Sequence, residues 1–296
     1  SVIHNNSGKP EITVVNIQKF QDDPNVVRNT DYNLNVQRVY FMDEVHRSYN
    51  PKGSFLANLN ESDRSAIKIG LTGTPLLGTD YNSKSLFGAY IHKYYYNSSI
   101  ADGCTLRLIR EEIETNYRLA LKQTLEEIDI LKGNADKKLV YAHPKFVEPM
   151  LDYIVQDFEK ARITMNDNTI GGMVVCDSSE QAKMLYETFQ TKYAEQKNGT
   201  EGLLMAAEPK QSYGDNKKNE SRVTKAAVIL HDIGTKDDRK NEVDQFKDGH
   251  IDLLFVYNML LTGFDAPRLK KLYIGRVIKA HNLLQTLTRV NRTYKD

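Results

Sequence analysis

The feature that most constrains the fold is a set of short apolar segments, rich in β-branched residues and bounded by turn residues. Their apolar residues run continuously instead of alternating with polar ones, which is typical of strands buried on both faces of a parallel sheet. Seven segments have this pattern: 12–17, 39–42, 67–71, 173–176, 226–230, 253–256 and 272–274.

Helical patterns lie between several of these segments. Residues 144–161 begin with Pro144, which suits a first helical turn, and carry apolar side chains at three-to-four spacing. Residues 179–192 begin at a serine of the kind that caps helices and also have one apolar face. Alternating strands and helices predict an α/β architecture.

The composition is that of an ordinary globular chain, with 27% charged and 40% hydrophobic residues. The net charge of +1 means that a nucleic-acid partner would need a local basic surface. Two distant cysteines, Cys104 and Cys176, exclude a disulfide framework and a zinc cluster. Without a membrane-length apolar run or a signal peptide, we expect a cytoplasmic protein with no membrane partner.

A length of 296 residues suggests about two domains. We predict a first domain over 1–115, with three strands and a β-rich passage over 105–115. A helical connector over 116–141 and a second domain over 142–296 follow. Residues 192–224 are polar for most of their length and are expected to form a surface insertion.

Two adjacent carboxylates, Asp43 and Glu44, directly follow the apolar segment 39–42. Ligands of parallel α/β sheets bind beyond the carboxyl ends of the strands. One carboxylate there could hold Mg²⁺ while the other activates a water molecule. The pattern is short, however, and taken alone it is more often a solvated strand end that starts a helix.

The sequence Thr72-Gly73-Thr74-Pro75 follows the next apolar segment, 67–71. A glycine between two small hydroxyl residues allows the backbone to approach a phosphate or a neighbouring domain closely. Alone, it is an ordinary strand-to-turn exit.

The sequence Thr262-Gly263-Phe264-Asp265 follows the apolar segment 253–256. Taken alone, this pattern is typical of a β-turn in which Asp265 caps the next segment.

Near the end of the chain, Gln285, Arg289 and Arg292 have the i, i+4, i+7 spacing that places side chains on one face of a helix. Two guanidinium groups on one face could clamp phosphates, although basic helix faces are usually solvated.

In this order, the four patterns resemble the motifs of superfamily-two helicases and translocases, which contain two RecA-like domains with parallel sheets. The resemblance implies that Asp43 holds Mg²⁺ and that Glu44 is the catalytic base. It implies that His46, Thr72 and Thr74 link ATP hydrolysis to domain closure. It implies that Gly263, Asp265 and Gln285 contact the nucleotide. Arg289 and Arg292 would stabilise the charge of the γ-phosphate. Gln18, Lys19 and Thr262 would contact DNA.

Longer stretches are similar to the motor (R) subunit of type I restriction-modification enzymes. These stretches are Asp-Glu-Val-His-Arg-Ser (43–48), Ile-Arg-Glu-Glu-Ile-Glu-Thr-Asn-Tyr (109–117), Asn-Met-Leu-Leu-Thr-Gly-Phe-Asp-Ala-Pro (258–267) and Leu-Leu-Gln-Thr-Leu-Thr-Arg-Val-Asn-Arg-Thr-Tyr (283–294). The resemblance implies ATP-driven translocation of double-stranded DNA before cleavage. It also implies assembly with methyltransferase and specificity subunits.

The chain departs from this family in one motif. A Walker A loop needs Gly-x-x-x-x-Gly-Lys-Ser/Thr after a strand, whereas Ser7-Gly8-Lys9-Pro10 lacks the first glycine and the hydroxyl. No cluster of acids with a lysine indicates a nuclease either. We therefore expect a fragment, truncated on the N-terminal side of its first RecA-like domain and inactive alone.

Two other readings remain open at this point. One is a superfamily-two DNA-repair or RNA helicase that unwinds its substrate. The other is a non-catalytic module in which RecA-like domains bind a partner, which the missing Walker A motif favours.

Overall fold

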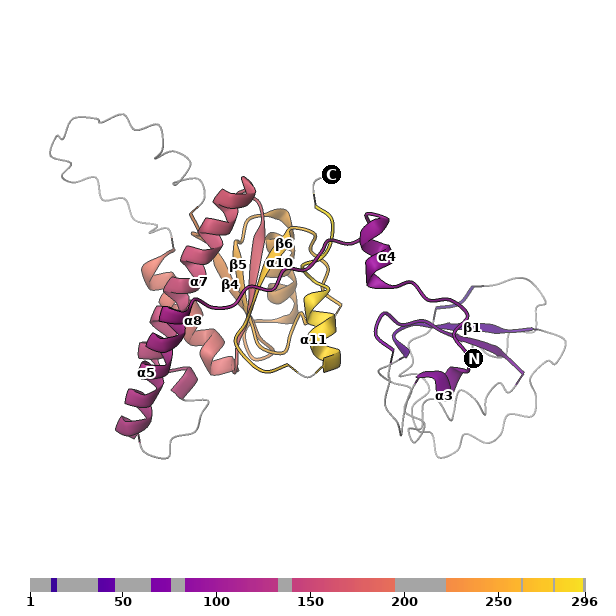
Figure 1. Ribbon diagram of the computed structural model, residues 1–296, viewed down its shortest axis with the longest axis horizontal. Coiled ribbons are helices and arrows are strands. Elements are labelled where there is room, and N and C mark those ends of the chain that lie inside the picture. The colour runs from indigo at the N-terminus through magenta and orange to yellow at the C-terminus, as the bar shows by residue number, and fades with distance from the viewer. Residues whose placement is uncertain are drawn as a thin grey trace. The chain divides into compact units, whose positions relative to one another are not determined.

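The computed structural model describes residues 12–14, 37–45, 65–75, 83–132, 140–194, 222–261, 263–278 and 280–294. The chain forms two compact units, Ser1–Tyr94 and Tyr95–Asp296, here called the first and the second unit (Figure 1). The predicted domain boundaries at 115 and 141 stay a prediction. Among the described residues, no helix combines the length and apolar character that a membrane crossing requires.

The first unit contains a pair of parallel strands, β1 (Val39–Met42) and β2 (Ile67–Gly70), and the short helix α3 (Ser83–Phe87). The pairing places Met42 opposite Gly70. A Cβ atom at Gly70 would lie 3.2 Å from the Phe87 ring, so the missing side chain allows α3 to pack closely. The two predicted strands at 39–42 and 67–71 are thus present.

One predicted strand of the first unit is not found where the structure describes it. Residues 12–14 form no strand, and 15–17 lie outside the described residues. Ile12 and Val14 are almost fully exposed, so they do not meet the burial that the apolar pattern predicts.

The second unit is built on a parallel sheet with the strand order β4-β5-β3-β6. Its strands are β3 (Gly171–Val175), β4 (Ala226–Ile229), β5 (Leu253–Val256) and β6 (Leu269–Ile274). The two central strands, β3 and β5, are buried at every position, as their continuous apolar sequences predict. The predicted α/β fold with parallel sheets is therefore confirmed.

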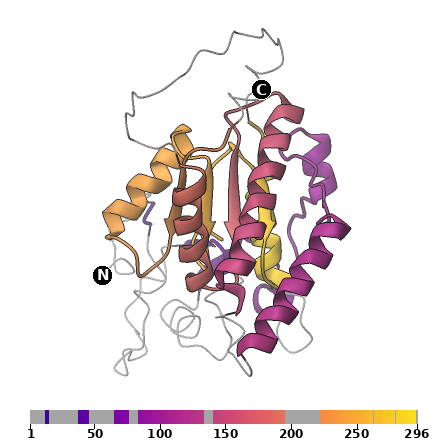
Figure 2. The same ribbon diagram turned by 90° about the vertical axis from the view of Figure 1, so that its left-hand side faces the viewer.

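Helices cover both faces of this sheet, as Figure 2 shows. On one face, α7 (Pro144–Met165) and α8 (Ser179–Lys192) pack on side chains such as Val174 and Phe255. On the other face, Phe246 of α10 (Lys236–Asp248) packs on side chains from alternate strand positions, including Val175. Because successive strand residues point to opposite faces, each central strand contributes to both cores.

Local sequence signals determine where these helices begin and end. The His143 side chain accepts a hydrogen bond from Lys145 N at the start of α7, and Ser178 caps α8 in the same way. Helix α10 starts with a reciprocal capping box between Thr235 and Asp238. These contacts satisfy backbone N–H groups that the first helical turn leaves without partners.

Three further helices belong to the second unit: α4 (Tyr96–Ala101), α5 (Thr115–Lys132) and α11 (Ala280–Leu287). The α5 helix lies within the predicted connector and packs on α7, where the rings of Tyr117 and Tyr153 stack with centroids 4.4 Å apart. The predicted β-rich passage over 105–115 is wrong, because residues 105–114 form no strand.

Candidate nucleotide and nucleic-acid site

The two predicted carboxylates follow directly after β1. Asp43 and Glu44 are exposed, and the backbone N–H of Glu44 donates to Asp43 Oδ1 at 2.9 Å. Glu44 has a φ of 50°, in the left-handed region that few residues other than glycine adopt. The turn thus leaves both carboxylates in solvent at the carboxyl end of a parallel strand, where ligands bind in α/β sheets.

Strand β2 brings the second predicted motif beside these carboxylates. Leu71 N donates to Met42 O at 2.8 Å, and Val45 N donates to Leu71 O at 3.2 Å. These bonds tie the two strand exits together, so Thr72 and Thr74 follow at the same edge of the strand pair as Asp43 and Glu44. His46, predicted to act with them, lies outside the described residues.

In the second unit, the loop after β5 contacts both predicted arginines. Arg292 Nη1 lies 2.8 Å from Asp265 Oδ2, and Arg289 Nη1 donates to the carbonyl oxygen of Phe264 at 2.7 Å. Gly263, with a φ of +71°, is exposed and allows the turn that precedes these two residues. Two patterns that are about twenty residues apart in the sequence therefore form one cluster.

The prediction that one helix face presents Gln285, Arg289 and Arg292 is wrong. Helix α11 ends at Leu287, and Arg289 N donates to Thr286 O at 3.2 Å in a tighter turn. The carbonyl oxygen of Asn291 accepts a hydrogen bond from Leu106 N at 2.6 Å, and Leu106 belongs to no helix. Both arginines thus extend from a non-helical segment.

Of the remaining predicted site residues, the structure describes one, Gln285. The Gln285 side chain is buried, and its backbone carbonyl accepts from Arg289 Nε at 3.0 Å. Gln18, Lys19 and Thr262, the predicted DNA contacts, lie outside the described residues.

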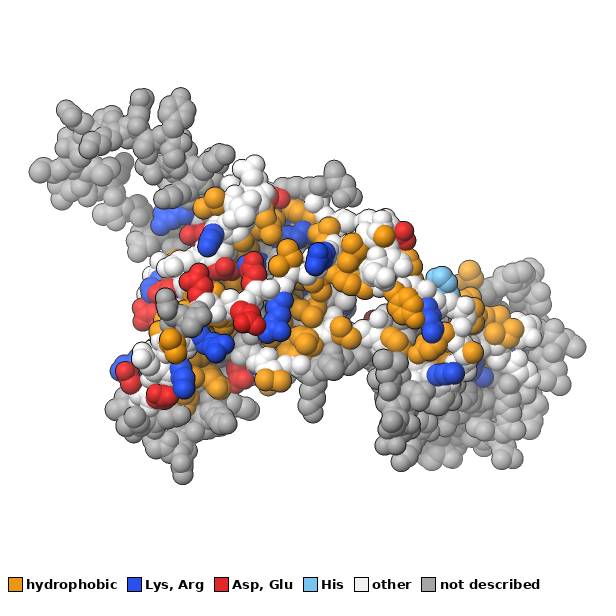
Figure 3. Space-filling model, in the orientation of Figure 1, with side chains coloured by type: hydrophobic (Ala, Val, Ile, Leu, Met, Phe, Trp, Pro, Cys, Tyr) orange, Lys and Arg blue, Asp and Glu red, His pale blue; other side chains and the backbone are white. Residues whose placement is uncertain are grey.

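Charge on the visible surface gives limited support for a nucleic-acid site. Figure 3 shows basic and acidic side chains interspersed over the part of the second unit near α5 and α7. Within the described part of the chain, no group of three or more His, Cys, Asp or Glu residues could hold a metal ion. A single carboxylate such as Asp43 still fits Mg²⁺, which in nucleotide sites takes one or two carboxylates together with substrate phosphates.

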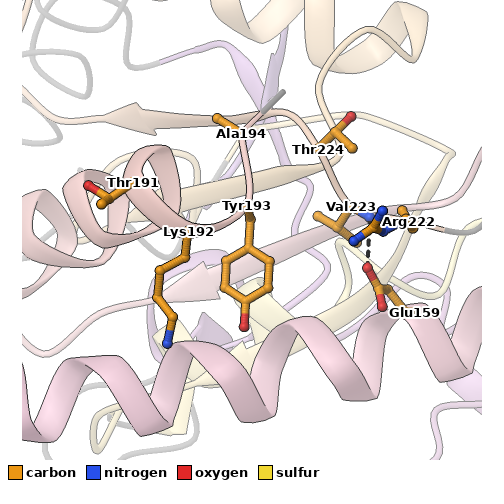
Figure 4. Close-up of a pocket in the computed structure, with 8 residues that line it drawn as sticks. All are labelled: Glu159, Thr191, Lys192, Tyr193, Ala194, Arg222, Val223 and Thr224. Atoms are coloured by element: carbon orange, nitrogen blue, oxygen red, sulfur yellow. Dashed lines mark hydrogen bonds between the residues drawn. The ribbon is translucent and has the colours of Figure 1, made fainter. Parts of the chain in front are cut away.

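A pocket of about 360 Å³ lies elsewhere, between α7, the end of α8 and the residues before β4 (Figure 4). Glu159 lines it and accepts a hydrogen bond from Val223 N at 3.0 Å. The pocket is at the amino end of β4, opposite the sheet edge where ligands of α/β sheets bind. It is therefore separate from the candidate site.

Comparison with protein families gives two matches in separate parts of the chain. Residues 2–139 match the family described as SWI2/SNF2 ATPase. Residues 168–296 match the family described as type I restriction enzyme subunit R domain 3. The first match includes Asp43, Glu44, Thr72 and Thr74, and the second includes Asp265 and both arginines.

Curated relatives extend over nearly the whole chain but are much longer. The HindI type I restriction enzyme endonuclease subunit of Haemophilus influenzae is 25% identical, over 95% of this chain and 27% of its own length. The SauMRSORF196P endonuclease subunit of Staphylococcus aureus is 27% identical, over 87% of this chain and 29% of its own length. The chain thus spans less than a third of either relative.

Among solved structures, a fragment of a type I restriction enzyme HsdR subunit from Vibrio vulnificus is 17% identical, with a TM-score of 0.49. The match covers 86% of this chain and 40% of that one. By sequence, the chain contains a region similar to SWI2/SNF2 ATPases followed by a region similar to domain 3 of type I restriction enzyme subunit R. It is related to the endonuclease subunits of type I restriction enzymes.

Proposed function

We propose that the chain is the ATP-dependent double-stranded DNA translocase portion of a type I restriction endonuclease motor subunit, which pulls DNA before cleavage. The observation that carries the proposal is the placement of Asp43, Glu44, Thr72 and Thr74 at one edge of two adjacent parallel strands. Their sequence order relative to the Asp265 loop and the arginines supports it further.

In this proposal the first unit supplies the acid and base chemistry. Asp43 would hold Mg²⁺, which offsets phosphate charge when it is bound. Glu44 would orient an attacking water and accept its proton. His46, Thr72 and Thr74 would link hydrolysis to movement of the units.

The second unit supplies positive charge and further contacts. Arg289 and Arg292 would stabilise the negative charge that develops on the transferred γ-phosphate. Gly263, Asp265 and Gln285 would contact the nucleotide. Gln18 and Lys19 of the first unit and Thr262 of the second unit would contact DNA. Methyltransferase and specificity subunits would complete the restriction enzyme.

The 296 residues contain no Walker A motif, so a phosphate cradle and its lysine are missing from this sequence. We infer that ATP hydrolysis requires a longer protein that carries this sequence together with a phosphate-binding loop, and that DNA cleavage would also require a nuclease domain. The same observation favours a second candidate, a non-catalytic module that binds a partner.

The test measures ATP hydrolysis by the longer protein and by this chain, with and without long double-stranded DNA. We expect hydrolysis by the longer protein only, stimulated by duplex DNA. Glu44→Gln should lower kcat by about 100-fold or more, as expected for loss of a general base. Arg289→Ala should lower it by about 1000-fold, as for loss of an arginine finger.

The matched control is Glu112→Gln, which removes an exposed carboxylate whose partner is the exposed Arg110. Its activity should equal that of the unmodified protein. Hydrolysis that survives both Glu44→Gln and Arg289→Ala would contradict the motor function. Strand displacement on a tailed duplex would instead indicate a helicase, and no hydrolysis with any nucleic acid would favour the binding module.

A further inference from the structure

An extended stretch of chain lies along the second unit between α4 and α5 (Figure 1). The stretch forms no strand, yet backbone groups of Leu106 and Leu108 are bonded to other parts of the unit. Leu106 N donates to Asn291 O at 2.6 Å, and Tyr96 OH donates to Leu106 O at 2.7 Å. Leu108 N donates to the same tyrosine oxygen at 2.9 Å. The stretch is therefore fixed to the unit by specific bonds.

A charged cluster anchors the other end of this stretch. The Glu111 carboxylate pairs with Lys271 on β6, and Lys271 Nζ also lies 3.0 Å from Asp157 Oδ2. Tyr273 OH donates to the same Asp157 oxygen at 2.7 Å. Burial disfavours the charged form of Lys271, but the hydrogen bonds to the two carboxylates outweigh it and raise the pKa of the ammonium. The Lys271 ammonium is thus charged at neutral pH.

Helix α11 ends at Leu287 and accepts hydrogen bonds from Arg289 at Thr286 O and Gln285 O. Arg292 lies beyond the helix, so the residues that carry it depend on contacts from other parts of the unit. Lys270 Nζ donates to Arg292 O, and Tyr294 OH lies 2.9 Å from Thr169 Oγ1. Asn291 is only 4% exposed, and its carbonyl is the acceptor for Leu106 N. The arginine-bearing residues therefore have contacts both to the start of β6 and to the extended stretch.

We propose that residues 105–111 are a positioning segment, which holds Asn291 and thereby keeps Arg289 and Arg292 in place for catalysis. This inference rests on the proposed function, in which the two guanidinium groups meet the γ-phosphate. A displacement of about 1 Å in a catalytic group can lower the rate by about 100-fold. A segment that never touches the nucleotide would thus control kcat.

The first test removes one donor. Leu106→Pro deletes the N–H that bonds to Asn291 O, and Leu106→Ala keeps it while shortening the same half-exposed side chain. In the longer protein that hydrolyses ATP, we expect Leu106→Pro to quicken amide hydrogen exchange over 289–293 at least about tenfold and to lower kcat for ATP about ten- to 100-fold. The KM for ATP should stay within about twofold, and Leu106→Ala should match the unmodified protein in every readout.

A second pair of variants tests the anchor without placing proline in the backbone. Glu111→Gln weakens the bond to Lys271 and leaves the Lys271–Asp157 pair in place. Glu112→Gln changes the neighbouring exposed carboxylate and serves as the matched control. We expect faster exchange over both 105–111 and 289–293 in Glu111→Gln, a smaller fall in kcat than with Leu106→Pro, and no change in Glu112→Gln.

Unchanged exchange over 289–293 in both Leu106→Pro and Glu111→Gln would overturn the positioning role. Faster exchange with an unchanged kcat in a folded, active protein would overturn it as well. If Arg289→Ala leaves hydrolysis intact, the proposed function fails. In that case the exchange measurements still show whether 105–111 orders the arginine-bearing residues.

Discussion

The candidate functional residues of the first unit and those of the second unit are held in place by different kinds of contact. In the first unit, Asp43 and Glu44 follow a strand directly, and backbone hydrogen bonds between the two strand exits fix their position. In the second unit, Arg289 and Arg292 are held by side-chain bonds to a loop that lies elsewhere in the sequence. The first arrangement depends on the register of two strands, and the second depends on long-range polar contacts.

The largest expected effect comes from removing an ion pair of the second unit whose arginine is buried. Arg162 is 2% exposed and donates to Asp252 Oδ1 at 2.6 Å and to Ile170 O at 3.0 Å. Arg162→Met should lower the free energy of unfolding by about 3 kcal/mol, because the largely buried Asp252 carboxylate loses its charged partner. Urea denaturation of the chain measures this change.

The control for this prediction is Lys183→Met, which removes the cation of the exposed Lys183–Asp232 pair. It should leave the urea midpoint unchanged, since exposed pairs often contribute nothing measurable. Equal effects of Arg162→Met and Lys183→Met would contradict the view that buried polar contacts organise this unit.

A pair of glycine substitutions compares the two units directly. A Cβ atom at Gly171 on β3 would lie 2.5 Å from Phe246 Cζ, whereas one at Gly73 would have no atom within 4 Å. Gly171→Ala should destabilise the chain by about 1–3 kcal/mol through overpacking. Gly73→Ala should leave the thermal midpoint unchanged, and a large loss there would show that the Thr72–Thr74 loop is more tightly enclosed than the structure indicates.

The smallest expected effect concerns the Arg292–Asp265 pair. Both side chains are about half exposed, at 43% and 58%, so solvent screens their attraction. Asp265→Asn should change the free energy of unfolding by less than about 1 kcal/mol. Asp244→Asn, in the similarly exposed Lys247–Asp244 pair, is the matched control.

A loss above about 2 kcal/mol in Asp265→Asn alone would mean that this pair supports the fold and does more than orient Arg292. Chemical denaturation of both variants under identical salt conditions decides between these outcomes.

The strands and the two long helices of the second unit could be predicted because their signals are local. Helix α8 covers the predicted range, 179–192, and β5 covers the predicted strand 253–256. Buried central strands produce continuous apolar runs, and amphipathic helices produce a 3.6-residue period. The placement of Asp43 and Glu44 at a strand end was predictable for the same reason.

The arrangement around the arginines could not be predicted from spacing. A helix through Arg292 would satisfy the i, i+4 rule, but the carbonyl of Asn291 bonds to Leu106, which lies far away in the sequence. Similarly, the apolar and β-branched residues over 105–115 suggest a strand, yet Tyr96 OH takes the place of a neighbouring strand. In both cases the deciding partner is a contact that no local pattern contains.

The packing of α5 has a consequence for how genes of this kind can recombine. Residues 95–139 fall within the SWI2/SNF2 match, but α5 packs on α7 of the second unit, where Tyr117 stacks on Tyr153. A crossover between the two matched regions, after residue 139, would pair one parent's α5 with another parent's α7. A crossover near residue 95 would instead inherit the whole interface from a single parent.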